Sequence, residues 1–116
     1  MSNEVTLPWP LKALNPNARV HWSVKAKAAK EYRHACHMLA RAARLQAPES
    51  EVIHLHLDFY PPTRRARDDD NLTAMFKAGR DGVADALGIN DSRFRTHAVL
   101  MTETGGKVKL RLEAAP

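Results

Sequence analysis

The chain has 116 residues, of which 44% are hydrophobic and 27% charged, and its formal net charge is +5; these values indicate one globular domain over residues 1–116 and exclude a disordered chain. The single cysteine, Cys36, excludes an internal disulfide and a zinc site made of thiolates. No basic, apolar leader opens the chain and no apolar run is long enough for a bilayer, so we expect a cytoplasmic protein with no membrane partner.

The predicted elements alternate between strand and helix along the chain. In order, the pattern predicts a strand at 5–7, a loop at 11–21, a helix at 23–45, a strand at 51–60, a helix at 70–87, and strands at 96–102 and 107–112. Gly105 and Gly106, between the last two strands, are typical of a hairpin. The order β-α-β-α-β-β predicts a single α+β domain with a mixed sheet and two main helices.

Apolar spacing assigns a core face to two of these elements. The helix at 23–45 is expected to bury a stripe of Tyr32, Cys36, Leu39 and Ala43. The strand at 51–60 alternates, with Ile53, Leu55, Leu57 and Phe59 on one face and His54, His56 and Asp58 on the other. The second set has the spacing of a metal motif, but the polar face of a half-buried sheet is the simpler interpretation.

The most distinctive segment is a run of three aspartates, Asp68, Asp69 and Asp70, directly after a cluster of arginines. Neighbouring carboxylates repel one another at neutral pH, and Mg²⁺ prefers oxygen ligands of this kind. Helix capping, at about 1 kcal/mol for one residue, accounts for one aspartate and not for three. In an extended segment Asp68 and Asp70 would point to the same side. The run therefore predicts a Mg²⁺ site in an enzyme acting on phosphodiesters of nucleic acid.

Positive charge is concentrated in the first half of the chain. Residues 11–47 hold eight basic residues and one carboxylate, Glu31, for a local net charge of +7. Such a surface suits the phosphate backbone of a nucleic acid, although a solvated helix face is the alternative. The residues expected to contact DNA lie in this region and in the arginine cluster: Asn15, Lys25, Lys27, Lys30, Arg33, Arg64, Arg65 and Arg67.

The segment 64–72, read as Arg-Arg-Ala-Arg-Asp-Asp-Asp-Asn-Leu, followed by a helix and Asn-Asp-Ser at 90–92, resembles the RusA family of Holliday-junction resolvases. That family has an arginine-rich turn, Asp-x-Asp-Asn-Leu, a helix and a further aspartate. The resemblance covers nearly the whole chain. It implies a Mg²⁺-dependent, homodimeric endonuclease of recombination and repair, which nicks four-way DNA junctions symmetrically and has no small-molecule substrate. The catalytic, metal-binding aspartates would be Asp68, Asp70 and Asp91.

Two positions depart from the family pattern. Asp69 stands where the family commonly has an apolar residue, and Ala74 stands where it often has a lysine. Lys77, expected further along the same helix, is the candidate to supply that catalytic charge. No serine or cysteine is placed as a nucleophile, so we expect direct hydrolysis by water. Two alternatives stay open: a metal-dependent nuclease for other branched DNA or for RNA, and an inactive junction-binding module.

Overall fold

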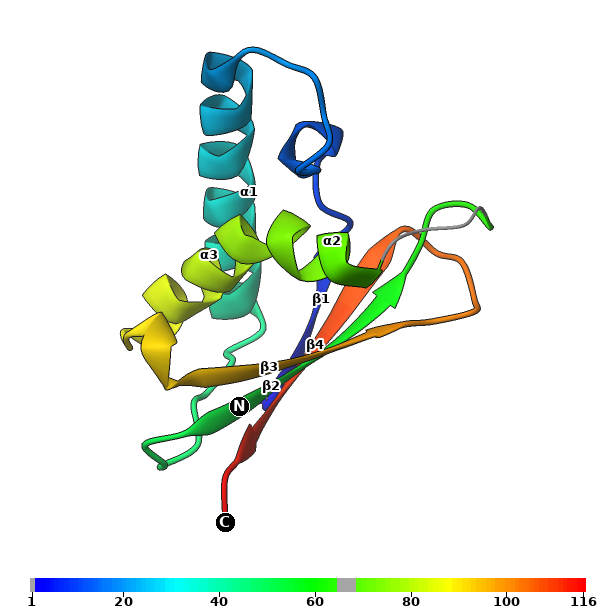
Figure 1. Ribbon diagram of the computed structural model, residues 1–116. Coiled ribbons are helices and arrows are strands. Elements are labelled where there is room, and N and C mark those ends of the chain that lie inside the picture. Colours follow the sequence, from blue (N-terminus) through cyan, green and yellow to red (C-terminus); the bar gives the residue numbers. More distant parts are fainter. Residues whose placement is uncertain (1, 65–68) are drawn as a thin grey trace.

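The centre of the sheet is β2 (Ile53–Tyr60), whose residues are alternately buried and half-buried as the sequence predicts. It pairs antiparallel with β4 (Lys107–Ala114) and parallel with β3 (Phe94–Leu100), while β1 (Glu4–Pro8) pairs antiparallel with the far side of β4. The strand order is therefore β1-β4-β2-β3 in one mixed sheet (Figure 1). This computed structural model describes residues 2–64 and 69–116, with only the backbone described for residues 69 and 70, and the α+β prediction is confirmed.

The predicted hairpin between the last two strands is wrong. β3 and β4 do not pair, because β2 lies between them. The connection from 101 to 106 instead crosses the end of β2, where the backbone amides of Gly105 and Gly106 both donate to the carbonyl of Pro61, at 3.0 and 3.4 Å. Gly106 has a φ of 67°, which a glycine adopts without strain. The two glycines thus mark a turn, but the turn leads to a strand on the other side of β2.

Helix α1 (Trp22–Ala42) begins one residue earlier than predicted and ends three residues earlier. The side chain of His21 caps it by accepting a hydrogen bond from the amide of Ser23. Its buried residues repeat every four positions rather than at three and four: Ala28, Tyr32, Cys36 and Ala40. Leu39 is 39% exposed, so the predicted stripe is wrong at that position. Spacing of four is typical of close helix packing along one ridge, and the helix that packs there is α3.

The single helix predicted at 70–87 is two helices, α2 (Asp69–Met75) and α3 (Lys77–Leu87). The break is at Phe76, whose ψ of −2° departs from the helical value. Its ring is buried and makes edge-to-face contacts with Tyr32 and Phe59, so core packing accounts for the turn of the chain. Gly88, with a φ of 68°, ends α3. Lys77 is consequently the first residue of a second helix and does not continue the helix that contains Asp70.

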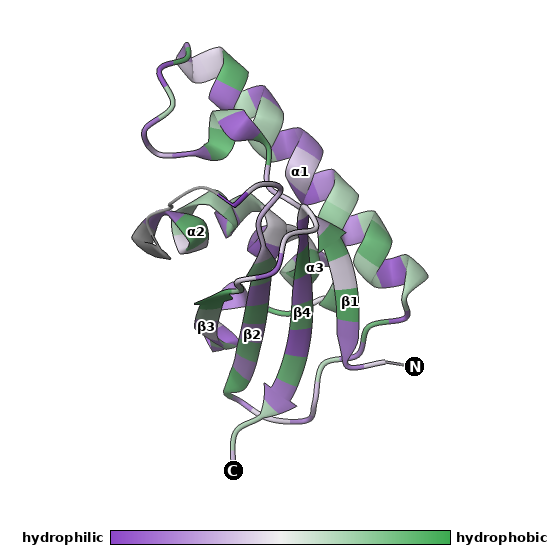
Figure 2. Cartoon of the chain, turned by 90° about the vertical axis from the view of Figure 1, so that its right-hand side faces the viewer, coloured by the Kyte–Doolittle hydropathy of each residue, from purple (hydrophilic) through white to green (hydrophobic). Residues whose placement is uncertain are grey.

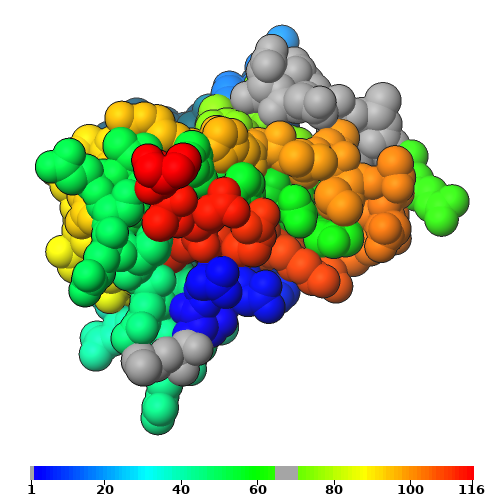
Figure 3. Space-filling view, turned by 90° about the horizontal axis from the view of Figure 1, so that it is seen from below, coloured from blue at the N-terminus to red at the C-terminus, as the bar shows by residue number. Residues whose placement is uncertain are grey.

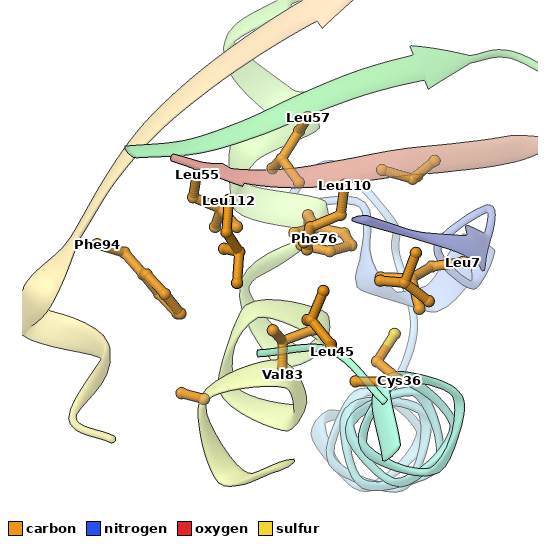
Figure 4. Packing of buried hydrophobic residues seen from close by; sticks show 14 of the residues in the cluster. Leu7, Cys36, Leu45, Leu55, Leu57, Phe76, Val83, Phe94, Leu110 and Leu112 are labelled. Atoms are coloured by element: carbon orange, nitrogen blue, oxygen red, sulfur yellow. The ribbon is translucent and has the colours of Figure 1, made fainter. Parts of the chain in front are cut away.

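All three α-helices lie on one face of the sheet, and the hydrophobic core fills the space between the two layers (Figures 1 and 4). Phe76, Val83, Leu110 and Leu112 meet in that core (Figure 4). Hydropathy alternates along β2 and β4, as Figure 2 shows, because the opposite face of the sheet has no helical layer. Seen from that side, the four strands form the surface in the order in which they pair (Figure 3).

Candidate nucleic-acid interface and metal site

The aspartate run meets the first turn of α2. Asp69 and Asp70 open this helix, which agrees with the preference of carboxylates for a helix N-terminus. Asp70 is helical rather than extended, so the expected two-residue alternation does not apply to it. Arg65, Arg67 and Asp68 lie outside the described residues. Arg64 is described and exposed, directly before that gap.

A groove of about 380 Å³ lies beside α2. Its walls come from η1 (Lys12–Leu14), α1, the end of α2 and the start of α3. It is lined by alanines and by the charged side chains of Lys25, Lys77 and Asp81. Ala74, which stands where the RusA family often has a lysine, lines this groove too. The fold thus brings the substitute candidate Lys77 and the predicted DNA contact Lys25 to one groove, although they are distant in sequence.

Lys77 is held by a neighbour on its own helix. Its Nζ lies 3.4 Å from Oδ2 of Asp81, four residues later, in a pair whose lysine side chain is 71% exposed. An exposed pair of this kind is weak, at about 0.5 kcal/mol. The lysine is therefore positioned in the groove but remains able to exchange its partner for a phosphate oxygen.

Arg33 is differently engaged. Its guanidinium donates to both carboxylate oxygens of Asp85, at 2.7 and 3.0 Å, and so ties α1 to α3. The hydrogen bond from Arg33 lowers the pKa of Asp85. A bidentate arginine has less capacity to bind a phosphate. By contrast, no ion pair in the described part of the chain involves Lys25, Lys27 or Lys30, which leaves these three α1 lysines available to a polyanion.

Asn15 has a local structural role in this fold. Its Oδ1 accepts a hydrogen bond from the amide of Asn17 at 2.9 Å, which closes the turn after η1. The residue is half-buried, and its side chain stabilises the turn that follows η1.

Asp91 lies in η2 (Asp91–Arg93), beyond the C-terminal end of α3. Its backbone carbonyl accepts a hydrogen bond of 2.7 Å from Arg80. In Figure 1, η2 and the start of α2 are at opposite sides of the molecule. The described residues therefore do not bring Asp91 to the aspartate run, and across 2–64 and 71–116 no group of three or more His, Cys, Asp or Glu side chains is arranged to hold a metal ion.

Three histidines on the open sheet face escaped the sequence analysis as a group. His54 Nδ1 lies 2.8 Å from His97 Nε2, and the rings of His56 and His97 stack at 5.0 Å. Glu113 completes the cluster, since its carboxylate lies 3.4 Å from His56 Nε2 and its pKa is lowered chiefly by that contact. Alternation alone predicts His54 and His56 on this face, but His97 joins them only through the parallel pairing of β2 with β3.

The comparison with protein families found no family model that matches this chain. Among curated proteins, an uncharacterized protein of Xylella fastidiosa (strain Temecula1 / ATCC 700964) is 50% identical over 102 residues, which are 85% of this chain and 67% of the relative. None of the described helices is both long and apolar enough to cross a bilayer.

Proposed function

We propose that this chain, which belongs to the same family as the uncharacterized protein of Xylella fastidiosa, is a Mg²⁺-dependent endonuclease that nicks four-way DNA junctions. The observation that carries the proposal is that Asp69 and Asp70 open α2, while the other end of this helix lines a groove with Lys25 and Lys77. Carboxylates that hold a metal and cations that bind phosphates are two parts that hydrolysis of a phosphodiester needs. The resemblance to the RusA family supports the same function.

The donor set fits Mg²⁺, since the run offers only carboxylate oxygens, the ligands that this hard cation prefers. Asp68 and Asp70 would hold the ion, which when bound would draw charge from the scissile phosphate and make the attacking water more acidic. Lys77 would stabilise negative charge as it develops on the phosphate, and Lys25, Lys27 and Lys30 would hold the backbone on either side.

Asp91 enters the proposal on the resemblance alone, because the described residues place it at the other end of α3. The variant Asp91→Asn decides its role. Loss of nicking with retained junction binding would make it the third catalytic carboxylate. Nicking within a few-fold of wild type would restrict the metal ligands to the run itself.

The direct test is binding and cleavage of a synthetic four-way junction in Mg²⁺, in Ca²⁺ and in a chelator. We expect paired nicks in Mg²⁺ and none with the chelator. Asp70→Asn should lower the nicking rate by ~100-fold or more while binding is retained or improved, because one charge that repels phosphates is gone. Asp58→Asn, which makes the same charge change on the open sheet face, is the matched control. Nicking by Asp70→Asn at the rate of the control would remove Asp70 from the site.

A second candidate is a junction-binding module without nuclease activity. Two observations favour it: Ala74 in place of the family lysine, and the distance along α3 between η2 and the start of α2. Tight binding of the junction without any nicking in Mg²⁺ or Mn²⁺ would establish this alternative. Competition among junctions, flaps, replication forks and RNA would show which branched substrate is preferred.

A further inference from the structure

Trp22 is the most exposed large hydrophobic side chain in the described part of the chain, at 74%. It is the first residue of α1, and Val20 and Val24 beside it are also exposed, at 42% and 48%. These three exposed apolar residues, Val20, Trp22 and Val24, lie at the N-terminal end of this helix, which we call the α1 tip. In Figure 1 this end of α1 projects beyond the layers that hold the core. Exposed apolar residues gathered in one place mark a binding surface more often than single ones do.

The indole of Trp22 is supported by the residue before it. The ring of His21 lies 5.3 Å from that of Trp22, at an angle of 38°. His21 is itself fixed, because its Nδ1 accepts from the amide of Ser23 at 3.2 Å and lies 2.7 Å from the Ser23 hydroxyl. The helix cap thereby holds one aromatic ring against another and leaves most of the indole surface open.

The segment of the chain that contains the α1 tip is basic. No carboxylate occurs between Glu4 and Glu31, whereas five basic residues do: Lys12, Arg19, Lys25, Lys27 and Lys30. Lys25, one turn after Trp22, also lines the groove beside α2. A second copy of this chain would bring the same positive charge to the surface, so charge complementarity favours a polyanion as the occupant. An aromatic platform within a basic surface is how proteins hold unpaired nucleotides.

We propose that Trp22, supported by His21, stacks on an unpaired base of a nucleic acid, while the lysines of α1 bind the adjoining phosphates. Unpaired or unstacked bases occur at the branch point of DNA, so the inference deepens the proposed function in that respect. It nevertheless concerns binding without chemistry, and it is measured without metal or cleavage. Lys25 connects the two places, since it follows Trp22 by one helical turn on α1 and also lines the groove.

Fluorescence gives a direct readout because the chain has only two tryptophans. Trp9 packs edge-to-face on Phe59, at 5.9 Å between ring centroids, so a Trp9→Phe background leaves Trp22 as the reporter. In a chelator, titration with single-stranded oligo(dT) should quench the fluorescence of Trp22 saturably, and a duplex of the same length should quench it less. Oligo(U) distinguishes RNA from DNA as the source of the base.

With the otherwise wild-type chain, Trp22→Ala should weaken binding of oligo(dT) and of a junction with unpaired bases by roughly 5- to 150-fold, the effect of losing one base stack. Duplex affinity should change less than about twofold, and Trp22→Phe should retain part of the affinity. Met38→Ala, which removes a half-exposed side chain farther along the same helix, is the matched control.

Equal losses for single strands and duplex, or affinity of Trp22→Ala equal to that of the control, would overturn the proposal. So would a change in oligomeric state of Trp22→Ala without nucleic acid, since the α1 tip would then be an interface between copies. Trp22-dependent binding without nicking would leave this inference standing and reject the nuclease. Nicking in Mg²⁺ together with binding that does not depend on Trp22 would support the nuclease and reject this inference.

Discussion

Lys77 shows how one side chain can lie in the right place with a competing partner. It lines the groove beside α2, but Asp81 lies 3.4 Å from its Nζ. The pair is exposed, so an incoming phosphate competes with Asp81 at little cost. If Lys77 replaces the lysine that the RusA family often has, we expect its charge to act in the transition state more than in binding.

Lys77→Ala is therefore expected to lower the nicking rate by about two orders of magnitude with little change in junction affinity. Single-turnover cleavage and gel shifts measure the two quantities separately. Lys109→Ala removes an exposed lysine of β4 on the open sheet face, away from the groove, and serves as control. A fall in junction affinity would instead show that Lys77 contacts the phosphate backbone of the DNA. In that case the slope of log affinity against log salt concentration should be smaller by about one. No change in either the nicking rate or the junction affinity would show that Lys77 neither stabilises the transition state nor contacts the DNA.

Cys36 is a buried thiol whose ionisation opposes folding. It has no exposed surface, and burial raises its pKa to about 11. Tyr32 beside it also has a raised pKa, chiefly from burial, and its hydroxyl donates to the carbonyl of Pro8 at 2.6 Å. Because the folded chain favours the neutral thiol, the thiol contributes to the stability of the fold. This contribution to stability is complete below the pKa of the unfolded chain, near 9, and is lost as the pH rises toward 11.

Between pH 8 and 10.5 we expect the thiol alone to lower the free energy of unfolding by about 2 kcal/mol. Urea unfolding under reducing conditions measures this difference for the wild type and for Cys36→Ala. The variant loses some stability at every pH through its missing sulfur, but its decline with pH should be shallower. The remaining slope includes the ionisation of Tyr32. Parallel curves for the two proteins would contradict the assignment.

At the scale of elements, the contact between α1 and α3 determines how closely the helical layer packs. A Cβ atom at Gly82 would lie 2.2 Å from the backbone carbonyl oxygen of Arg33, and one at Gly79 would lie 2.7 Å from the ring of Tyr32. The two glycines, which lower local helix propensity, are thus required by helix packing. The Arg33–Asp85 pair spans the same contact.

Gly82→Ala should lower the free energy of unfolding by about 3 kcal/mol, because the opposing atom belongs to a backbone that cannot move aside alone. This loss outweighs the gain of ~1 kcal/mol in helix propensity. Chemical denaturation gives the value. Gly105→Ala is the control, since its nearest neighbour is the flexible end of Lys107 at 3.3 Å. Equal stability of the two variants would mean that α1 and α3 separate at little cost.

At the scale of the whole molecule, the two faces carry different chemistry. The helical layer bears the aspartate run, the lysine-lined groove and the α1 tip. The open sheet face bears the histidine cluster with Arg111 and Glu113 in the adjoining strand. We therefore expect the proposed substrate to contact the helical layer, where one chain offers it one aspartate run.

Symmetric nicking of a four-way junction requires two sites, so we expect a homodimer when the junction is bound. Sedimentation of the protein at micromolar concentration, with and without the junction, measures the assembly. A single chain on each junction would exclude symmetric resolution, although not nicking itself. Asp70→Asn, expected to bind without cutting, keeps the junction intact during the measurement.

The sequence by itself determined the local elements and the chemical character of the candidate site. Alternation in β2 and the helical period of α1 depend on neighbours within one element, and the aspartates with their arginines are contiguous. Only tertiary structure decided that β2 separates β3 from β4, that Phe76 breaks the second helix, and that Lys25 and Lys77 share a groove. Strand pairing and side-chain packing join residues far apart in the chain, so no local pattern specifies them.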